Sequence, residues 1–271
     1  SDLHVLRFHL PPTDCAVAAD AQERPVGKPR QRLDPLVMND ERVDFVLSNV
    51  AKIDHVERIR IGSRTPVVLP QRITDKLINI IAKYHKPGKR EIVLVTHFEH
   101  PYEVTPEAME AIQKFKRHGI SVYNQAVFTL ENSRRYELVA LRKALRLIGV
   151  DPYYTFNTKG KKETKNYRVP LARLMQEIKE EARLTPGTVR TDEPVYNVPR
   201  LGKNYIRAQQ HHSLIMILPS GERVYEFHPW EKKLALADTY VDTDVSIWDY
   251  LQELKRRGED IEDYRTIWYY Y

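Results

Sequence analysis

The hydrophobic and polar positions between residues 57 and 128 repeat one pattern. Three short apolar runs, at 59–61, 92–95 and 120–122, are each followed by polar residues, and apolar residues recur at helical spacing between the runs. Strands that alternate with helices and end in polar residues are typical of a parallel α/β sheet or barrel, whose binding groups gather at the carboxyl ends of the strands. We therefore expect the polar groups at 62–66, 96–101 and 124–125 to share one mouth.

The same periodicity predicts further helices and strands along the chain. Helices are expected at 40–53, 74–84, 106–118, 135–148 and 171–184, and a strand at 150–156. The third of these helices has the fullest start signal, because Thr105 can cap it, Pro106 occupies its first position and Gly119 follows its end. In the second helix the spacing predicts a buried stripe formed by Leu77, Ile80, Ile81 and Tyr84.

The pattern divides the chain into three parts. Residues 1–33 carry no clear periodicity and are expected to be irregular, and residues 34–204 are expected to form the β/α part. Residues 205–271 differ, with a hairpin predicted from the apolar runs 214–218 and 224–227 around a Pro-Ser-Gly-Glu turn, a short helix at 246–257 and an aromatic tail. We expect this last part to be an α+β appendage.

Composition and charge add limits rather than a function. The chain has 271 residues, of which 42% are hydrophobic, enough for a substantial core. It contains no apolar run long enough to span a membrane and no signal-peptide pattern at its start, so a cytoplasmic protein is expected. The net charge of +6 would suit an anionic partner, but basic and acidic residues are interspersed along the helices, as at 177–183. We interpret those segments as solvated faces and do not expect nucleic-acid binding.

Cysteine and histidine content restricts metal chemistry. Cys15 is the single cysteine, which excludes a disulfide within the chain and a four-cysteine zinc site. An iron–sulfur cluster needs three or four thiolates, so this chain alone cannot hold one. His97 and His100 are three residues apart, but two ligands make no site, and no metal site is predicted.

Three sequence blocks carry a resemblance to a known family. The blocks RIGSRTPVVLPQRIT at 60–74, THFEHPYEVT at 96–105 and GISVYNQAV at 119–127 occur in an order and spacing that resemble the lysine 2,3-aminomutase family. The resemblance runs from about residue 34 to about residue 203. It implies a partial (β/α) TIM-like barrel of the radical S-adenosylmethionine type, and an isomerase that uses S-adenosylmethionine, pyridoxal phosphate (PLP) and a 4Fe-4S cluster. The family's three-cysteine cluster motif is absent here.

The resemblance also suggests cofactor-binding residues. It implies that Lys203, in a Gly-Lys pair after an Asp-x-Pro sequence, holds PLP, because such enzymes bind the aldehyde through a lysine amine. The run before that lysine is longer than in the family and mostly not glycine. The resemblance further places His97, His100 and Gln125 along the S-adenosylmethionine pocket, and it favours a cofactor anion as the partner of Arg64. Glu99 stands where the family usually has asparagine.

Two further positions concern the substrate. In lysine-specific members two aspartates bind the distal ammonium group, and the resemblance places Asp192 at one of these positions and Lys159 at the other. A lysine there would repel a second ammonium and attract a carboxylate. The substrate expected from the resemblance is therefore an amino acid other than lysine, acidic or uncharged. Lys159 also lies in a basic loop, where it could simply be solvated.

Alternatives remain for the function as a whole. The first hypothesis is an amino acid 2,3-aminomutase, which moves an amino group between adjacent carbons, or a portion of one. The second is a PLP-binding protein or subunit on a degenerate barrel that has lost the cluster, and a weaker third is a nucleic-acid binding module. The aromatic C-terminal region, which ends in Trp268 and three tyrosines, indicates a contact between identical subunits.

Overall fold

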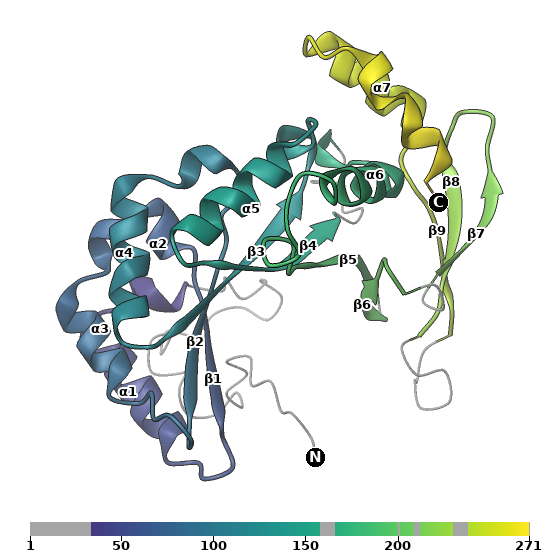
Figure 1. Cartoon of the computed structure of the whole chain (residues 1–271). Helices are drawn as coiled ribbons and strands as arrows, with labels where there is room; N and C mark the ends of the chain where they lie inside the picture. The colour runs from purple at the N-terminus through teal and green to yellow at the C-terminus, as the bar shows by residue number, and fades with distance from the viewer. Residues whose placement is uncertain (1–33, 158–165, 200, 209–211, 230–237, 271) are drawn as a thin grey trace, which may run out of the picture. The chain divides into compact units, whose positions relative to one another are not determined.

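The computed structural model describes residues 34–157, 166–199, 201–208, 212–229 and 238–270 (Figure 1). The predicted irregular segment 1–33, Cys15 and the basic loop that carries Lys159 lie outside these residues. The chain forms two compact units. The described part of unit 1 comprises residues 34–97, 104–123 and 148–150, and unit 2 comprises 98–103, 124–147 and the described residues from 151 onward. The two units do not test the boundaries expected at residues 34 and 205, which stay predictions.

The strands form two sheets. The first sheet has the order β1-β2-β3-β4-β5-β6, with β1 and β2 parallel, β4 and β5 parallel, and β5 and β6 antiparallel. The second is antiparallel with the order β7-β8-β9. The protein is therefore a mixed α/β protein with an additional antiparallel sheet. The strands are β1 (Arg58–Gly62), β2 (Glu91–Thr96), β3 (Ser121–Phe128), β4 (Asp151–Asn157), β5 (Glu193–Val198), β6 (Gly202–Tyr205), β7 (His212–Ile217), β8 (Arg223–Phe227) and β9 (Tyr240–Thr243).

The helices follow the strands closely in sequence. Those of the α type are α1 (Asp40–Ala51), α2 (Thr65–Val68), α3 (Asp75–Ala82), α4 (Pro106–Arg117), α5 (Glu137–Leu147), α6 (Leu171–Glu181) and α7 (Ile247–Arg256). Those of the 3-10 type include η1 (Pro35–Val37), η2 (Pro70–Arg72), η3 (Pro101–Glu103), η4 (Leu130–Asn132) and η7 (Ile261–Tyr269). Among the described residues, no helix combines the length and apolar character needed to cross a membrane. A cytoplasmic location stays a prediction.

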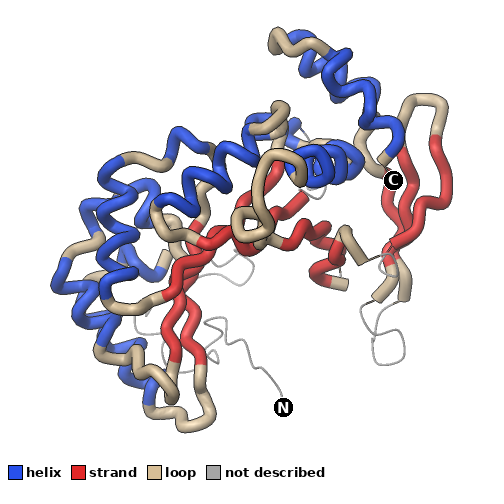
Figure 2. Tube along the Cα trace, in the orientation of Figure 1, coloured by secondary structure: helices blue, strands red, loops and turns tan. Residues whose placement is uncertain are grey.

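Unit 1 confirms the local helix signals. Thr105 accepts a hydrogen bond from the backbone N–H of Ala108 and caps α4, and Thr74 caps α3 in the same way. Asn39 caps α1, which begins at Asp40 as predicted. The stripe of α3 differs from expectation, because Ile78 is buried while Ile80 and Tyr84 are half-buried. In this unit α1, α3 and α4 lie on one side of β1 and β2 (Figure 2).

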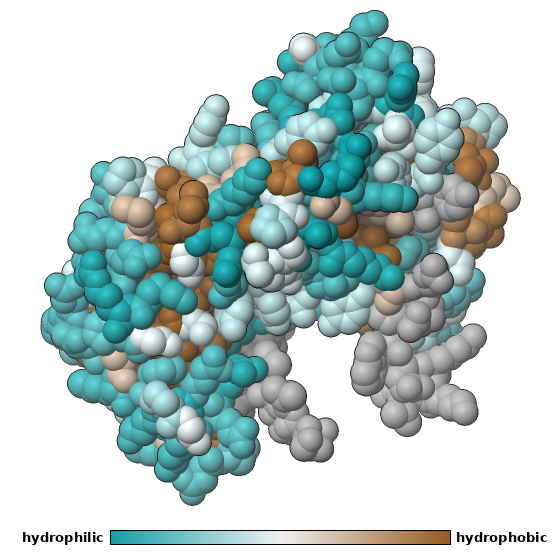
Figure 3. All heavy atoms as spheres, viewed as in Figure 1, coloured by the Kyte–Doolittle hydropathy of each residue, from teal (hydrophilic) through white to brown (hydrophobic). Residues whose placement is uncertain are grey.

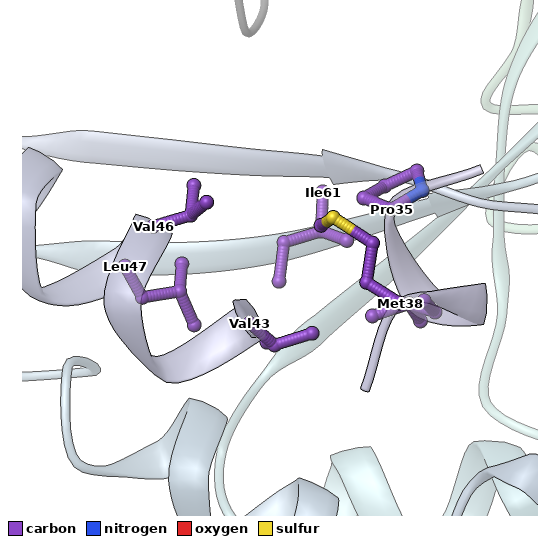
Figure 4. Close-up of a pocket in the computed structure, with 7 residues that line it drawn as sticks. Pro35, Met38, Val43, Val46, Leu47 and Ile61 are labelled. Carbon is purple, nitrogen blue, oxygen red and sulfur yellow. The ribbon is translucent and has the colours of Figure 1, made fainter. Parts of the chain in front are cut away.

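A small apolar hollow lies within unit 1, between η1, α1 and β1 (Figure 4). Its lining consists of apolar side chains only: Pro35, Leu36, Met38, Val43, Val46, Leu47 and Ile61. Because none of these side chains carries a charge or a strong hydrogen-bonding group, the hollow offers nothing to orient an amino acid or a phosphate. We interpret it as imperfect packing of the helix against the sheet.

Unit 2 confirms the predicted hairpin and short helix and adds strands that the sequence did not predict. Strands β7 and β8 form the hairpin, and Ser246 caps α7. Strands β5, β6 and β9 were not expected, and the aromatic tail forms the 3-10 helix η7. Figure 3 shows hydrophobic side chains gathered over the β7–β8 hairpin, where Ile215, Met216 and Ile217 are more than half exposed.

The interpretation of 177–183 as a solvated face is wrong for its acidic residues, although Lys179 and Arg183 are exposed. In α6 the charged residues Glu177 and Glu181 are fully buried, and Glu180 is 8% exposed. Helix η7 packs on α6, and Thr266 of η7 donates a hydrogen bond to Glu180. Buried arginines provide the counter-charges, since Arg173 donates to Glu177 at 2.6 Å. The carboxylates of this run therefore belong to an internal ion-pair network, whereas its basic residues are exposed.

Candidate functional site

Arg64 and His97 lie in unit 1, Arg64 two residues after the end of β1 and His97 directly after β2. Arg64 is exposed and holds the N-cap position of α2, and its backbone N–H donates to the Asp34 carboxylate at 2.7 Å. The same carboxylate accepts hydrogen bonds from the Ser63 hydroxyl (2.7 Å) and the Leu36 backbone (2.9 Å). Asp34 thus fixes the turn that presents the Arg64 guanidinium. His97 is half-buried after the last residue of β2.

His100 and Gln125 lie in unit 2. The His100 ring faces Glu137 of α5, with Nε2 3.6 Å from the carboxylate, and its Nδ1 accepts from the backbone of Tyr102 at 3.2 Å. Gln125 is 7% exposed on β3. Its neighbour Asn124 hydrogen-bonds both the N–H (2.7 Å) and the carbonyl (3.0 Å) of Phe98. That amide holds the segment leading to His100 against β3.

Glu99 has a structural role beside these residues. Its carboxylate accepts a hydrogen bond from the backbone N–H of Val127 at 2.5 Å, and its carbonyl accepts from the Asn132 side chain at 2.8 Å. The carboxylate thus binds the backbone near the end of β3, a contact that sequence spacing did not reveal.

Lys203 lies on β6 above an aromatic surface. Its Nζ is 3.8 Å from the centre of the Tyr154 ring and 6.0 Å from that of Phe156. The strand registers pair Phe156 with Val195 and Val195 with Tyr205, so these side chains share one face of β4–β5–β6 with Lys203, two residues from Tyr205. We call this surface the Lys203 face. Its polar and aromatic members are half-buried rather than buried.

Asp192 lies on the opposite face of the same strands. Its Oδ2 accepts hydrogen bonds from the Thr155 hydroxyl and from Arg142 Nη2 of α5, both at 2.5 Å. Thr155 pairs with Pro194 and therefore points away from Phe156 and Lys203. Asp192 and Lys203, eleven residues apart, are consequently not brought together. This buried side, the Asp192 face, also carries Asn157, Tyr196 and Asn204, each 2% exposed.

One arginine serves two carboxylates on the Asp192 face. Arg142, 1% exposed, donates to Asp192 and also forms a short contact with Glu181 of α6. Burial would raise the pKa of Asp192, but the Arg142 guanidinium and the hydrogen bond from Thr155 hold it below its usual range. For Glu181, burial and the two neighbouring carboxylates outweigh Arg142 and raise the pKa to about 7.

Sequence reasoning missed Arg142 and Tyr154. Arg142 occurs in an amphipathic helix with other basic residues, where an arginine normally faces water. Tyr154 belongs to the strand predicted at 150–156, to whose aromatic residues the sequence analysis assigned no role. A usable signal was the alternation in β4, where Tyr154 and Phe156 fall on one face and Thr155 and Asn157 on the other.

Metal ligands do not cluster in the part of the chain that the structure describes. There, no group of three or more histidine, cysteine, aspartate or glutamate side chains could hold an ion. His97 belongs to unit 1 and His100 to unit 2. The predicted substrate residue Lys159 lies outside the described residues, so its surroundings stay a prediction.

Comparison with known proteins identifies relatives. An uncharacterized KamA family protein of Methanocaldococcus jannaschii is 50% identical over 238 residues, which cover 88% of this chain and 38% of that protein. The L-lysine 2,3-aminomutase of Clostridium subterminale is 33% identical over 192 residues (68% of this chain, 44% of that enzyme). The glutamate 2,3-aminomutase of Clostridioides difficile is 38% identical over 135 residues (49% and 31%).

These relatives are longer than the matched part of the chain. The chain spans less than half the length of each of the three. No model of a protein family matches it. The sequence blocks that suggested the resemblance are nevertheless supported by identities of 33 to 50% over long alignments. The chain belongs to the lysine 2,3-aminomutase (KamA) family.

Proposed function

We propose that the chain is part of an amino acid 2,3-aminomutase, an isomerase that moves an amino group between adjacent carbons. Kinship with lysine and glutamate 2,3-aminomutases supports the reaction class. The observation that carries the proposal is the position of Lys203, whose amine lies 3.8 Å from an aromatic ring on a half-buried surface of the sheet. We further propose that the sheet belongs to a partial barrel of the radical S-adenosylmethionine type.

The residues around Lys203 fit PLP. A lysine amine can hold the cofactor's aldehyde, and the rings of Tyr154 and Phe156 offer a flat surface to a pyridine ring. Gly202 has φ +76°, and nothing lies within 4 Å of the place where a Cβ would stand, so the backbone beside Lys203 can be approached closely. When bound, PLP stabilises electron density on the carbon that bears the amino group.

The other cofactor residues are proposed on the resemblance. His97, His100 and Gln125 would donate or accept hydrogen bonds along S-adenosylmethionine, and Arg64 would bind a cofactor anion. The 4Fe-4S cluster of the family needs thiolates that this chain does not supply, since Cys15 is its single cysteine. We therefore confine the proposal to what the chain's own residues bind.

We propose that the substrate is an amino acid other than lysine, acidic or uncharged. Lys159 would favour a carboxylate on the substrate side chain. Asp192, for which the resemblance implies a substrate role, is 2% exposed on the face opposite Lys203, and Arg142 compensates its charge, so a substrate ammonium would gain little from it. A glutamate 2,3-aminomutase among the relatives shows that the family includes a member named for an acidic amino acid.

We also propose that identical subunits associate through the C-terminal region. Edge strand β7 contains no charged residue, and its Ile215, Met216 and Ile217 are 52%, 54% and 56% exposed. An uncharged, apolar edge strand favours pairing with another strand, and a second copy brings no like charge to it. Sedimentation of wild-type protein and of Met216→Lys tests this proposal, which a monomeric wild type would refute.

Covalent trapping tests the proposed function. The purified chain is mixed with PLP, reduced with borohydride and mapped by mass spectrometry, using wild type, Lys203→Ala and Lys179→Ala. Lys179 is the matched control, because its amine also faces an aromatic ring, 5.8 Å from the centre of Tyr270. A single adduct on Lys203, lost only in Lys203→Ala, is expected. Adducts scattered over many lysines, or none, would remove the support for a PLP site on this chain.

The alternative functions give different results. A non-catalytic PLP-binding relative would show the same adduct, but the full-length gene product would contain no iron. A nucleic-acid binding module would show no adduct and would bind oligonucleotides with steep salt dependence. Iron analysis of the full-length product and oligonucleotide binding at two salt concentrations therefore separate the three hypotheses.

A further inference from the structure

We propose that Tyr154 is the positioning residue for Lys203, and that its ring face holds the amine as an ammonium ion on the Lys203 face. The contact is 3.8 Å from Nζ to the ring centre, well inside the roughly 6 Å range of cation–π attraction. Phe156 lies farther away, at 6.0 Å, and contributes less. This inference rests on the proposed function for its role in catalysis, while the contact itself does not depend on PLP.

Tyr154 is held in place by other aromatic side chains. Its ring centre lies 4.0 Å from that of Tyr153 and 5.6 Å from that of Phe156. Burial raises the pKa of the Tyr154 phenol far above its usual value, and hydrogen bonds with Tyr153 and Tyr205 raise it further. The ring therefore stays neutral under ordinary conditions and presents an electron-rich face to a cation.

The position of the two residues in the sheet makes this contact specific. Tyr154 lies on β4 and Lys203 on β6, so the lysine side chain reaches across β5 to the ring. A lysine has four rotatable side-chain bonds and loses considerable rotamer freedom when it is fixed. Holding the amine on the ring keeps it at one place on the Lys203 face instead of in solution.

Other charged groups near this surface must be considered. By the strand register Glu193 shares the Lys203 face. Its carboxylate lies 3.6 Å from Arg207 Nη1, so the two opposite charges partly compensate each other. Tyr205 and Tyr153 are the neighbouring titratable phenols. The Tyr154 ring, 3.8 Å from Nζ, is a cation-stabilising group in direct contact with the amine. Glu193→Gln is therefore a useful control.

The consequence concerns the reactivity of the amine. Aldehydes and acylating reagents react with the neutral amine. A ring that stabilises the ammonium ion lowers the fraction of the amine that is neutral at a given pH, compared with an ordinary lysine of pKa ~10.4. Removing the ring should raise the reactivity of Lys203 at neutral pH by about two- to five-fold, the factor equivalent to ~0.5–1 kcal/mol at ~1.4 kcal/mol per tenfold.

Trace acetylation with mass spectrometry measures this effect on the full chain without PLP. The variants are Tyr154→Phe, which keeps the ring, and Tyr154→Leu, which removes it, with Tyr154→Met as a second ringless variant if the Leu variant does not fold. Lys179 serves as the internal reference in every sample. We expect Lys203 labelling near pH 7 to rise two- to five-fold in the ringless variants and to stay near wild type in Tyr154→Phe and Glu193→Gln.

The pH profile separates electrostatic stabilisation of the ammonium ion from steric protection of the amine by the ring. If the ring acts on the charge, the labelling ratio between the ringless variants and wild type falls as pH rises through the ordinary lysine pKa of ~10.4, and it is clearly smaller at about pH 11 than at pH 7. A ratio of the same size at pH 11 as at pH 7, or an equal increase in Tyr154→Phe, would overturn the inference. Borohydride trapping of PLP is scored separately. A lost PLP adduct with a normal acetylation pattern would refute the proposed function and leave the contact standing.

Discussion

Arg142 is the residue whose loss should damage unit 2 most. Its guanidinium is 1% exposed, donates to Asp192 at 2.5 Å and contacts Glu181, and both carboxylates are themselves buried. Replacing it with methionine keeps much of the side-chain volume but removes the charge. Asp192 and Glu181 would then be left buried without their shared counter-ion. The perturbation is therefore electrostatic rather than a cavity.

The magnitude follows from the burial of the pair. Removing one partner of a buried ion pair costs ~3–5 kcal/mol, because the other charge remains desolvated. With a urea m-value of about 2 kcal/mol/M, this free energy lowers the unfolding midpoint by roughly 1.5–2.5 M. Neutralising Asp192 as well, in Arg142→Met with Asp192→Asn, should recover part of the loss, since one orphaned charge is removed.

Tryptophan fluorescence during urea unfolding is a suitable assay. All three tryptophans follow residue 229 in the sequence, so their signal reports on unit 2, which contains Arg142. Arg257→Met is the matched control. Arg257 also makes two contacts to a carboxylate, at 3.0 and 3.1 Å, but that carboxylate belongs to Glu131, which is 58% exposed.

The control sets the refuting result. Exposed ion pairs contribute ~0–1 kcal/mol, so Arg257→Met should shift the midpoint by less than about 0.5 M. If Arg142→Met unfolds no more readily than Arg257→Met, the network does not hold a buried charge at Asp192. If the double variant is less stable than Arg142→Met, the loss does not come from an orphaned carboxylate.

Three further substitutions test neighbouring contacts. Glu181 has a folded-state pKa raised to about 7 from 4.5, so its contribution to stability falls as pH rises between these values. Glu181→Gln should flatten the decline of the free energy of unfolding from pH 5 to 8 by up to ~3 kcal/mol, or roughly 1.5 M in the urea midpoint, and an unchanged slope would contradict this. Asn124→Ala removes both hydrogen bonds to the Phe98 backbone and should cost ~2–3 kcal/mol in urea unfolding, whereas a neutral change would show that water replaces them. Arg223→Met removes the hydrogen bond to the Trp268 carbonyl (2.8 Å) and should speed proteolysis after residue 260, with equal rates as the contrary outcome.

Local signals predicted the elements that local physics determines. Thr105 and Pro106 fix the start of α4 through a cap and a preset φ, and both act within one helical turn. Strands β5 and β6 escaped prediction because 193–205 contains proline, glycine and asparagine and lacks alternation of apolar and polar residues. Pairing with β4, about 40 residues earlier, makes β5 a strand, and no local pattern encodes that partner.

Burial of charge was the larger failure of sequence reasoning. Arg173 and Glu177 are spaced i, i+4, as surface ion pairs on helices usually are, yet both are fully buried. The reason is η7, which comes about 80 residues later and packs on α6. A helix pattern shows which side chains share a face, but only the tertiary structure shows whether that face meets water.

The two faces of β4–β5–β6 explain why the predicted site divides as it does. Lys203 and Asp192 look like members of one site because eleven residues separate them, but alternation along β5 turns them to opposite sides. On the Asp192 face the buried carboxylate of Asp192 is stabilised by Arg142, so substitutions on that face change the stability of the fold. On the Lys203 face an aromatic ring accompanies the amine, so changes there act on its reactivity. A variant of Arg142 should therefore unfold unit 2 at lower urea while the acetylation ratio of Lys203 to Lys179 in the folded protein stays unchanged, and a ringless variant of Tyr154 should raise that ratio.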